Sequence, residues 1–224
     1  MARRSGWVDP YAGMAGQRLF VAVPLPAEAA AAVIEVVDAV RAMPLPVGMR
    51  DVRWVRMDGL HLTLRFLGPT PPDRLTPTTE AVLAAAAMTT PIPLAIAGAG
   101  TFPAGPRPRT LWLGLTTGVP ELTELAAALD SALAGAGWPV DGRPVRPHLT
   151  LARSDGMAAG PLVAGRLAAA MVDRSIEAVA DTVVLFESVT GGGPARYVPI
   201  ASAGLTAEST DAHPVYHQTD PDST

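Results

Sequence analysis

The 224-residue sequence contains no cysteine and no lysine, so the 17 residues counted as lysine or arginine are all arginine. Without cysteine, the chain forms no disulfides and has no thiolate nucleophile. Without lysine, it has neither Schiff-base chemistry nor the Walker-type loop that binds nucleotide phosphates. These absences exclude several common classes of enzyme and give no reason to expect an oxidising compartment.

Long apolar runs are also missing. No segment reaches the roughly 20 consecutive apolar residues that a membrane helix requires. Asp9 and Pro10 interrupt the N-terminal segment where an export signal would have its apolar core. We therefore expect a cytoplasmic protein that is not inserted in a membrane.

The charge distribution narrows the function further. A net charge of −4 lacks the overall basic character of a nonspecific nucleic-acid binder, although a local basic cleft is compatible with it. The acidic residues show no paired spacing typical of carboxylate catalysis or of a two-metal centre. We therefore expect no metal and no other cofactor.

Hydrophobic periodicity predicts an α+β fold. We expect strands at 18–26, 52–55, 60–68, 92–98, 109–115, 148–153, 180–189 and 196–203, and helices at 27–43, 73–88, 120–134 and 162–172. The rhythm of the first half of the chain returns in the second half, which predicts two similar lobes within one domain over residues 17–205. Residues 206–224 are polar and almost free of aliphatic side chains, so we expect a disordered tail there and a flexible segment over residues 1–16.

The tetrapeptide HLTL occurs twice, at residues 61–64 and 148–151, although the chain has only four histidines. Side chains on a strand alternate between its two faces, so each copy presents a histidine and a threonine on one face and two leucines on the other. We expect one copy in each lobe. Two such strands across a cleft would bring two imidazoles and two hydroxyls to one ligand.

This set of side chains suits a phosphodiester. The hydroxyls of Thr63 and Thr150 can bind the nonbridging oxygens, while His61 and His148 act as acid and base on opposite sides of phosphorus. Histidine has a reference pKa near 6.5, so the two rings can divide these roles without a metal. A single His-x-Thr on a strand is usually an ordinary hydrogen-bonded pair, but the recurrence of all four residues favours catalysis.

Arginines flank both motifs and could hold the charge of a phosphate. Arg65 follows the first copy, and Arg146 and Arg153 bracket the second. Arg153 stands three positions after Thr150, so in an unbroken strand it points away from the catalytic face. If Arg153 reaches the phosphate, the strand must end or bulge near Ala152.

Other patterns are weaker signals of function. His213 and His217 have the spacing of half a helical metal site, but Pro214 and the polar surroundings favour disorder. The glycines within Thr190–Pro194 are more typical of a hairpin turn than of a phosphate loop.

Four aromatic residues, Phe20, Trp54, Trp112 and Tyr197, fall on predicted strands. Proteins often recognise single-stranded RNA ends by stacking bases on such rings. Because most aromatic residues on strands belong to the core, we expect at most one or two of them to contact a substrate. Phe20 and Tyr197, together with Arg65 and Arg146, are the candidate substrate contacts.

The two motifs and the segments around them resemble the two-histidine (2H, LigT-like) phosphoesterase superfamily, and within it the bacterial RNA 2′,3′-cyclic phosphodiesterases of the 2′-5′ RNA ligase family. The likeness extends over RLFVAVPLP, RWVRMDGLHLTLRFLG, FPAGPRPRTLWLGL, RPHLTLAR and VVLFESVTGGGPARYVPI, which stand in the family's order from about Arg18 to Leu205. The turn MDGL before His61 is less polar than its counterpart in the family.

The resemblance implies a bilobal, pseudo-twofold fold in which two mainly antiparallel sheets face a central cleft, with the helices packed outside. It implies that His61 donates a proton to the leaving oxygen and His148 activates water. Thr63, Thr150 and Arg153 would then bind the phosphate. The implied reaction opens a terminal 2′,3′-cyclic phosphate of RNA to a 2′-phosphate, or forms a 2′-5′ linkage when a 5′-hydroxyl is the nucleophile. The implied partners are RNA ends, such as those of tRNA fragments, and we expect a monomer.

Two other functions stay open. The same site could act on a small nucleotide, such as a cyclic phosphate of ADP-ribose or a 2′-5′ oligonucleotide, in which case the rate would not rise with RNA length. Alternatively, the fold could be a noncatalytic module that binds RNA ends. Loss of His61 or His148 would then leave function intact.

Overall fold

The computed structural model describes residues 16–155, 159–190 and 194–207. Most of the predicted N-terminal segment, and the predicted tail from residue 208 on with its two histidines, lie outside this range. So do the three glycines of the Thr190–Pro194 turn.

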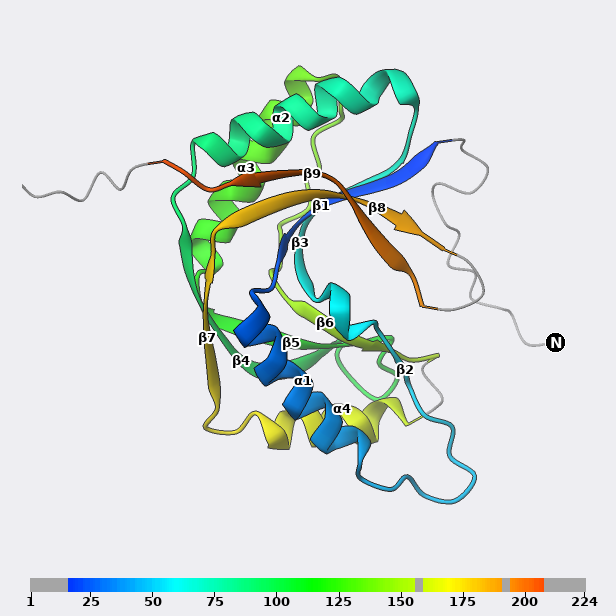
Figure 1. Ribbon diagram of the computed structural model, residues 1–224. Helices are drawn as coiled ribbons and strands as arrows, with labels where there is room; N and C mark the ends of the chain where they lie inside the picture. The colour runs from blue at the N-terminus through cyan, green and yellow to red at the C-terminus, as the bar shows by residue number, and fades with distance from the viewer. Residues whose placement is uncertain (1–15, 156–158, 191–193, 208–224) are drawn as a thin grey trace, which may run out of the picture.

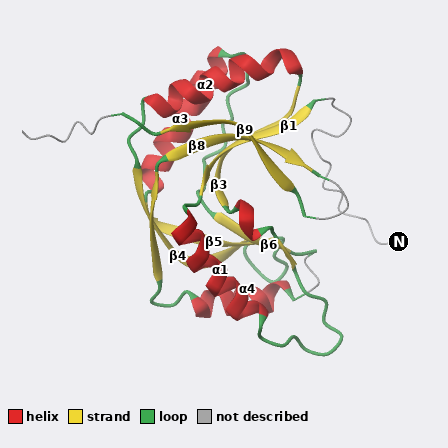
Figure 2. Ribbon diagram, viewed as in Figure 1, coloured by secondary structure: helices red, strands yellow, loops and turns green. Residues whose placement is uncertain are grey.

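Helices and strands alternate along the described chain (Figures 1 and 2). The strands are β1 (Gln17–Pro24), β2 (Arg53–Trp54), β3 (His61–Thr70), β4 (Ile92–Phe102), β5 (Thr110–Thr117), β6 (Leu149–Arg153), β7 (Ser175–Ala180), β8 (Thr182–Val189) and β9 (Arg196–Gly204). The α-helices are α1 (Ala27–Arg41), α2 (Leu75–Ala87), α3 (Val119–Gly135) and α4 (Gly160–Ala170). The predicted α+β class is confirmed.

Among the described residues, the strands form one curled antiparallel sheet in the order β7-β4-β5-β6-β3-β1-β8-β9, with β2 paired to β6. The two predicted sheets are joined at its centre, where β3 and β6 pair through Leu62 and Leu149. Helices α2 and α3 pack together on the half that contains β3, and α1 and α4 pack together on the other half (Figure 1). Two lobes therefore meet at the two HLTL strands.

The lobes do not coincide with the two halves of the chain, contrary to the sequence-based expectation. The lobe that contains His61 takes β8 and β9 from the C-terminal part of the chain, and the other lobe takes β4 and β5 from the first half. In addition, the sequence pattern predicts one strand over residues 180–189 and does not predict β7, most of which lies before residue 180. The structure instead has two strands, Ser175–Ala180 and Thr182–Val189, separated by Asp181.

Helix α1 shows how the sequence builds the outer layers. Its buried residues are Ala29, Val33, Val36, Val37 and Val40, which recur at the spacing of one helical face. Its charged residues, including Glu28, Asp38 and Arg41, lie on the remaining surface. One stripe of each helix thus covers the sheet and buries the apolar core between them.

A buried arginine fixes the segment between α3 and β6 against β3. The Arg65 side chain is 8% exposed, and its guanidinium contacts Asp130 of α3 at 3.0 Å and Asp141 at 2.7 Å. It also donates a hydrogen bond to the Pro139 carbonyl. Arg65 therefore connects the strand that follows His61 to the segment that precedes His148.

Replacing Arg65 with alanine leaves the largely buried Asp130 without its cation and Asp141 with the exposed Arg143 alone, so we expect Arg65→Ala to lower the free energy of unfolding by about 3 kcal/mol. Arg143→Ala is the matched control, because Arg143 contacts the same Asp141 but its side chain is 77% exposed. Arg143→Ala should lower the free energy of unfolding by less than about 1 kcal/mol. Urea denaturation of both variants measures the difference, and equal effects would contradict this role for Arg65.

Candidate active site

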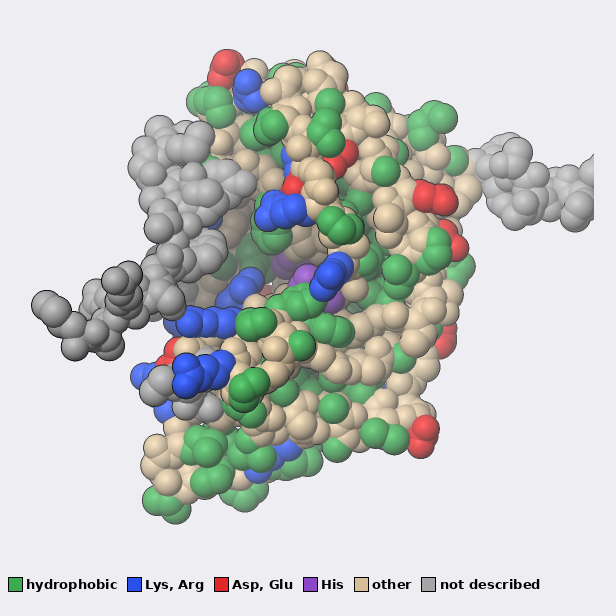
Figure 3. Space-filling view, turned by 180° about the vertical axis from the view of Figure 1, so that it is seen from behind, with side chains coloured by type: hydrophobic (Ala, Val, Ile, Leu, Met, Phe, Trp, Pro, Cys, Tyr) green, Lys and Arg blue, Asp and Glu red, His purple; other side chains and the backbone are tan. Residues whose placement is uncertain are grey.

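Each HLTL motif presents its histidine and threonine on one face of the sheet. His61 and Thr63 are partly exposed, while Leu62 and Leu64 are buried; His148, Thr150, Leu149 and Leu151 repeat this pattern. The predicted alternation is therefore present in both strands. Seen from the side opposite Figure 1, the two histidines lie in a hollow with arginine side chains around it (Figure 3).

Both imidazoles are held in the same way. Nδ1 of His61 lies 2.7 Å from the Gly59 carbonyl oxygen, and Nδ1 of His148 lies 2.6 Å from the Arg146 carbonyl oxygen. A carbonyl oxygen only accepts hydrogen bonds, so Nδ1 carries the proton in both rings. This leaves each Nε2 to accept a proton when the ring is neutral or to donate one when it is charged.

Aromatic rings surround each histidine. The ring centroid of His61 lies 5.0 Å from that of Phe20, 4.9 Å from that of Tyr197 and 6.1 Å from that of Phe186. The ring centroid of His148 lies 5.0 Å from that of Phe102 and 6.1 Å from that of Trp112. Phe102 and Phe186 carried no sequence signal of proximity to a histidine, because only the strand pairing brings them there.

The aromatic surroundings affect the charge of both rings. Burial lowers the pKa of His61, and the positive charges of His148 and Arg153 lower it further, against the opposing effect of the Gly59 hydrogen bond. Burial likewise lowers the pKa of His148, with Arg153 acting in the same direction and the Arg146 hydrogen bond opposing. Burial also raises the pKa of the Tyr197 hydroxyl, so this group stays protonated at neutral pH.

A β-bulge brings Arg153 to the face that carries His148 and Thr150. Along β5 and β6, Trp112 pairs with Thr150 and Leu111 pairs with Ala152, so Leu151 is the extra residue. Leu151 and Ala152 are both buried, and Arg153 is exposed on the side of Thr150. Its guanidinium contacts the Thr110 hydroxyl at 3.4 Å, and its charge acts on both histidines and on Tyr197.

A second arginine at this place was not predicted. Arg53 of β2 stands directly opposite Arg153 on the neighbouring strand and is exposed. Like charges directly opposite one another destabilise a strand pair. Within the described part of the chain, Arg53 has no ion-pair partner, so an anion bound here would relieve this repulsion.

The candidate substrate contacts differ in their positions. Phe20 is 2% exposed and packs behind His61, so it has no free ring face for a substrate. Arg65 is turned away from the cleft toward its two aspartates, because a bulge in β3 follows Thr63. The prediction that Phe20 and Arg65 contact a substrate is therefore wrong for both residues. Tyr197 beside His61 and the exposed Arg146 remain candidates.

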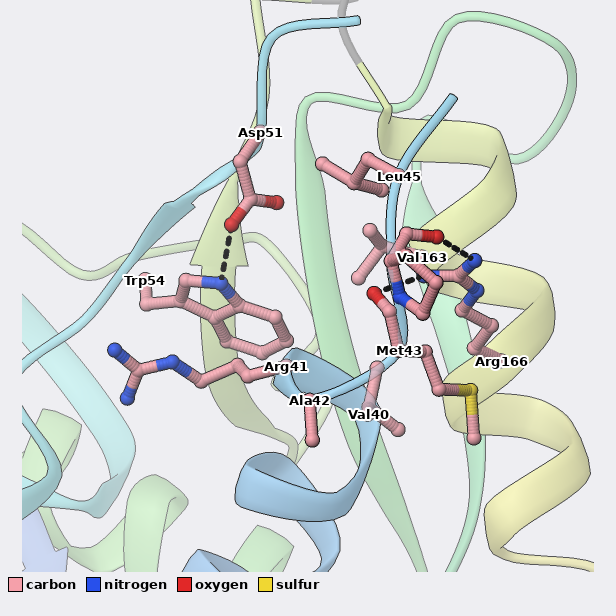
Figure 4. A pocket seen from close by; sticks show the side chains of 10 residues that line it. Val40, Arg41, Ala42, Met43, Leu45, Asp51, Trp54, Val163 and Arg166 are labelled. Carbon is pink, nitrogen blue, oxygen red and sulfur yellow. Dashed lines mark hydrogen bonds between the residues drawn. The ribbon is translucent and has the colours of Figure 1, made fainter. Parts of the chain in front are cut away.

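The other two aromatic candidates lie on opposite faces of the sheet. Trp54 faces α1 and α4, where it lines a cavity of about 230 Å³ and donates a hydrogen bond to Asp51 (Figure 4). It is therefore excluded from the cleft. Trp112 faces His148, and its ring lies so close to Gly100 that a Cβ there would be 2.3 Å from it.

Comparisons with known proteins agree with this geometry. The family model of the 2′-5′ RNA ligase superfamily matches residues 20–192. The chain belongs to this superfamily. This confirms the family resemblance drawn from the two motifs.

Several curated relatives are named RNA 2′,3′-cyclic phosphodiesterase. The one from Geobacillus stearothermophilus is 38% identical over 135 residues, which cover 60% of this chain but 41% of the relative. That from Aquifex aeolicus is 30% identical, and the match covers 45% of this chain and 54% of the relative. The chain thus matches about half the length of these two relatives. The one from Escherichia coli is 35% identical, with coverages of 61% and 72%.

Solved structures show the same fold. Escherichia coli LigT bound to 3′-AMP is 29% identical with a TM-score of 0.63, and the likeness covers 85% of this chain and 99% of LigT. A protein of Thermus thermophilus is 25% identical with a TM-score of 0.67, covering 86% and 100%. The predicted LigT-like fold is therefore confirmed.

The described residues contain neither a cluster of metal-binding side chains nor a membrane-spanning helix. No group of three or more His, Cys, Asp or Glu side chains within them could hold a metal ion. No helix among them is long and apolar enough to cross a membrane.

The tautomers and pKa values of the two histidines can be measured directly. We expect nitrogen-15 NMR to show Nδ1–H in both neutral rings and both pKa values below 6.5. Arg153→Met should raise both pKa values, because removing a positive charge favours the protonated rings. Arg174 is exposed and directly precedes the edge strand β7, so Arg174→Met is the matched control and should leave both pKa values unchanged. Unchanged values in Arg153→Met would contradict the proximity of this guanidinium.

Proposed function

We propose that this protein hydrolyses terminal 2′,3′-cyclic phosphates of RNA to 2′-phosphates by general acid and base catalysis. The observation that carries the proposal is the pair of equivalent histidines, each anchored through Nδ1 with Nε2 left for a substrate. Membership of the superfamily and the names of the relatives support the choice of substrate.

The two equivalent imidazoles suit an in-line displacement, and the family resemblance supports His148 as the base and His61 as the acid. His148 Nε2 accepts a proton from water, whose oxygen then attacks phosphorus. The bond from phosphorus to the 3′-oxygen breaks on the opposite side, and His61 Nε2 donates its proton to that oxygen. His148 thus becomes positively charged and His61 becomes neutral, and the product carries a 2′-phosphate. A 5′-hydroxyl in place of water would give a 2′-5′ linkage.

The threonines and Arg153 bind the phosphate in this proposal. Among the described residues, neither Thr63 nor Thr150 has a hydrogen-bond partner for its hydroxyl, so both can donate to the nonbridging oxygens. Arg153 adds a charge-assisted contact to the same oxygens. These interactions strengthen as negative charge accumulates in the transition state.

A second candidate keeps this chemistry on a small nucleotide. Solved structures of LigT hold 3′-AMP, NADP⁺ or ATP, so small nucleotides bind to proteins of this fold. The dependence of kcat/KM on RNA length separates the two candidates. A rise with length supports RNA, because remote contacts then contribute to turnover.

The first test is hydrolysis of a short RNA with a 2′,3′-cyclic phosphate end, in the presence of EDTA. We expect a 2′-phosphate product, and a loss of at least about 10²-fold in kcat for His61→Ala and for His148→Ala, because each removes one proton transfer. Urea denaturation should show both variants folded. A folded variant with the wild-type rate would remove that histidine from the mechanism, and inhibition by EDTA would contradict a metal-independent reaction.

The pH dependence follows from the lowered pKa values. Catalysis needs one ring protonated and the other neutral, a form most abundant between the two pKa values of the free enzyme. Because burial lowers both pKa values, we expect kcat/KM to be bell-shaped with its maximum below pH 6.5. It should fall toward higher pH as the acid loses its proton, and toward lower pH as the base gains one. A maximum above about pH 7 would contradict this assignment.

A further inference from the structure

The two motif strands share their first four residues and differ at the fifth, where Arg65 and Ala152 face away from the histidines, and at the sixth. In β3, Ala22 pairs with Thr63 and Val21 pairs with Arg65, so Leu64 is an extra residue, as Leu151 is in β6. Both strands therefore return a side chain to the histidine face three positions after the threonine. In β6 this side chain is Arg153, and in β3 it is Phe66.

Phe66 is a large apolar side chain in an exposed position. It is 55% exposed, and its ring centroid lies 6.0 Å from that of Phe20, which lies 5.0 Å from His61. The Phe66 ring is therefore no more than about 11 Å from His61. A single exposed phenylalanine is ordinary elsewhere on a protein surface, but here it occupies the place that the other lobe gives to Arg153.

Phe66 also lines a groove of about 570 Å³, a volume typical of ligand pockets. The groove lies between β3 and the segment that leads to His148, with lining residues that include Phe66, Pro69, Pro71, Trp138, Val140 and Arg143. One wall thus belongs to the strand that carries His61, and the other belongs to the segment that precedes His148. None of the motif histidines or threonines lines it, so it adjoins the catalytic site without being part of it.

The groove is mainly apolar and has little net charge. Asp130 and Asp141 offset the charges of Arg65 and Arg143, and Arg74 adds one positive charge at the rim. Val140 is 68% exposed and provides a second apolar wall. Flat apolar and aromatic surfaces with arginines at the rim suit a nucleobase more than a row of phosphates.

We propose that this groove binds a base of the RNA strand next to the nucleotide that carries the cyclic phosphate, with Phe66 stacked on that base. The proposal rests on the proposed function, because it takes the cyclic phosphate to lie between the two histidines. Arg153 then holds the phosphate on one side of the pseudo-twofold axis, while Phe66 holds a base on the other. The groove thereby favours RNA strands over mononucleotides.

The test compares adenosine 2′,3′-cyclic phosphate with a tetraadenylate that ends in a 2′,3′-cyclic phosphate. Phe66→Ala should lower kcat/KM for the tetranucleotide at least about fivefold, the low end for loss of one stacking contact, and change it less than about twofold for the mononucleotide. Phe66→Trp should retain activity on both. Val179→Ala, at a 50% exposed position on the edge strand β7, is the control and should change neither.

Tetranucleotides with one abasic position locate the base. Removing the stacked base should lower kcat/KM for the wild type and abolish the difference between the wild type and Phe66→Ala. Equal effects of Phe66→Ala on both substrates, or a difference that persists at every abasic position, would overturn the proposal.

Failure of the proposed function is a separate outcome, seen when the wild type hydrolyses neither substrate. The same variants and abasic series are then compared for binding of a tetraadenylate with a 3′-phosphate, measured by fluorescence anisotropy. Weaker binding by Phe66→Ala at least about fivefold, lost at one abasic position, supports the base site without the catalytic assignment. Equal binding by the wild type and by Phe66→Ala overturns the proposed base site.

Discussion

The arrangement of the site depends on one cross-strand pair at the centre of the sheet. Leu62 and Leu149 are fully buried and join β3 to β6, and in the described chain these two strands share no other pair. Each leucine directly follows a motif histidine, so the antiparallel pairing of the leucines places His61 and His148 diagonally across the pair, on the opposite face. The separation of the histidines is thus fixed by the core, and core packing tolerates little displacement.

The two half-sites on either side of this pair are nearly equivalent but not identical. Identical HLTL strands, identical Nδ1 anchors and similar bulges give each lobe one imidazole and one hydroxyl. On the face that carries the histidines, the symmetry ends at the sixth motif residue, which is Phe66 in one lobe and Arg153 in the other. A cyclic phosphate end is itself asymmetric, with a charged group on one side and a nucleoside on the other, so a symmetric scaffold needs such a difference to orient it.

The sequence predicted what depends on local pattern, and missed what depends on strand order. The alternation in HLTL and the helix faces follow from residues close in the chain, whereas a break or bulge near Ala152 is expected only on the condition that Arg153 reaches the phosphate. The exchange of strands between lobes does not follow from nearby residues, because β7 and β8 are separated by Asp181 alone yet lie at different positions in the sheet. The misassignment of Arg65 has the same origin. An arginine next to a phosphate motif suggests a phosphate ligand until tertiary structure shows Asp130 and Asp141 beside it.

Burial of the histidines links substrate binding to protonation. Burial among the aromatic rings and the charge of Arg153 lower the pKa of both imidazoles in the free protein, so near neutral pH the site carries little charge of its own beyond the arginines. An anionic phosphate placed between the rings opposes both effects, because it stabilises an imidazolium at short range. By linkage, the protonated form binds the anion more tightly by the same factor. In the proposed mechanism, Arg153 would therefore attract the phosphate and also favour neutral rings before the phosphate binds, so that substrate binding favours the protonated ring that catalysis needs.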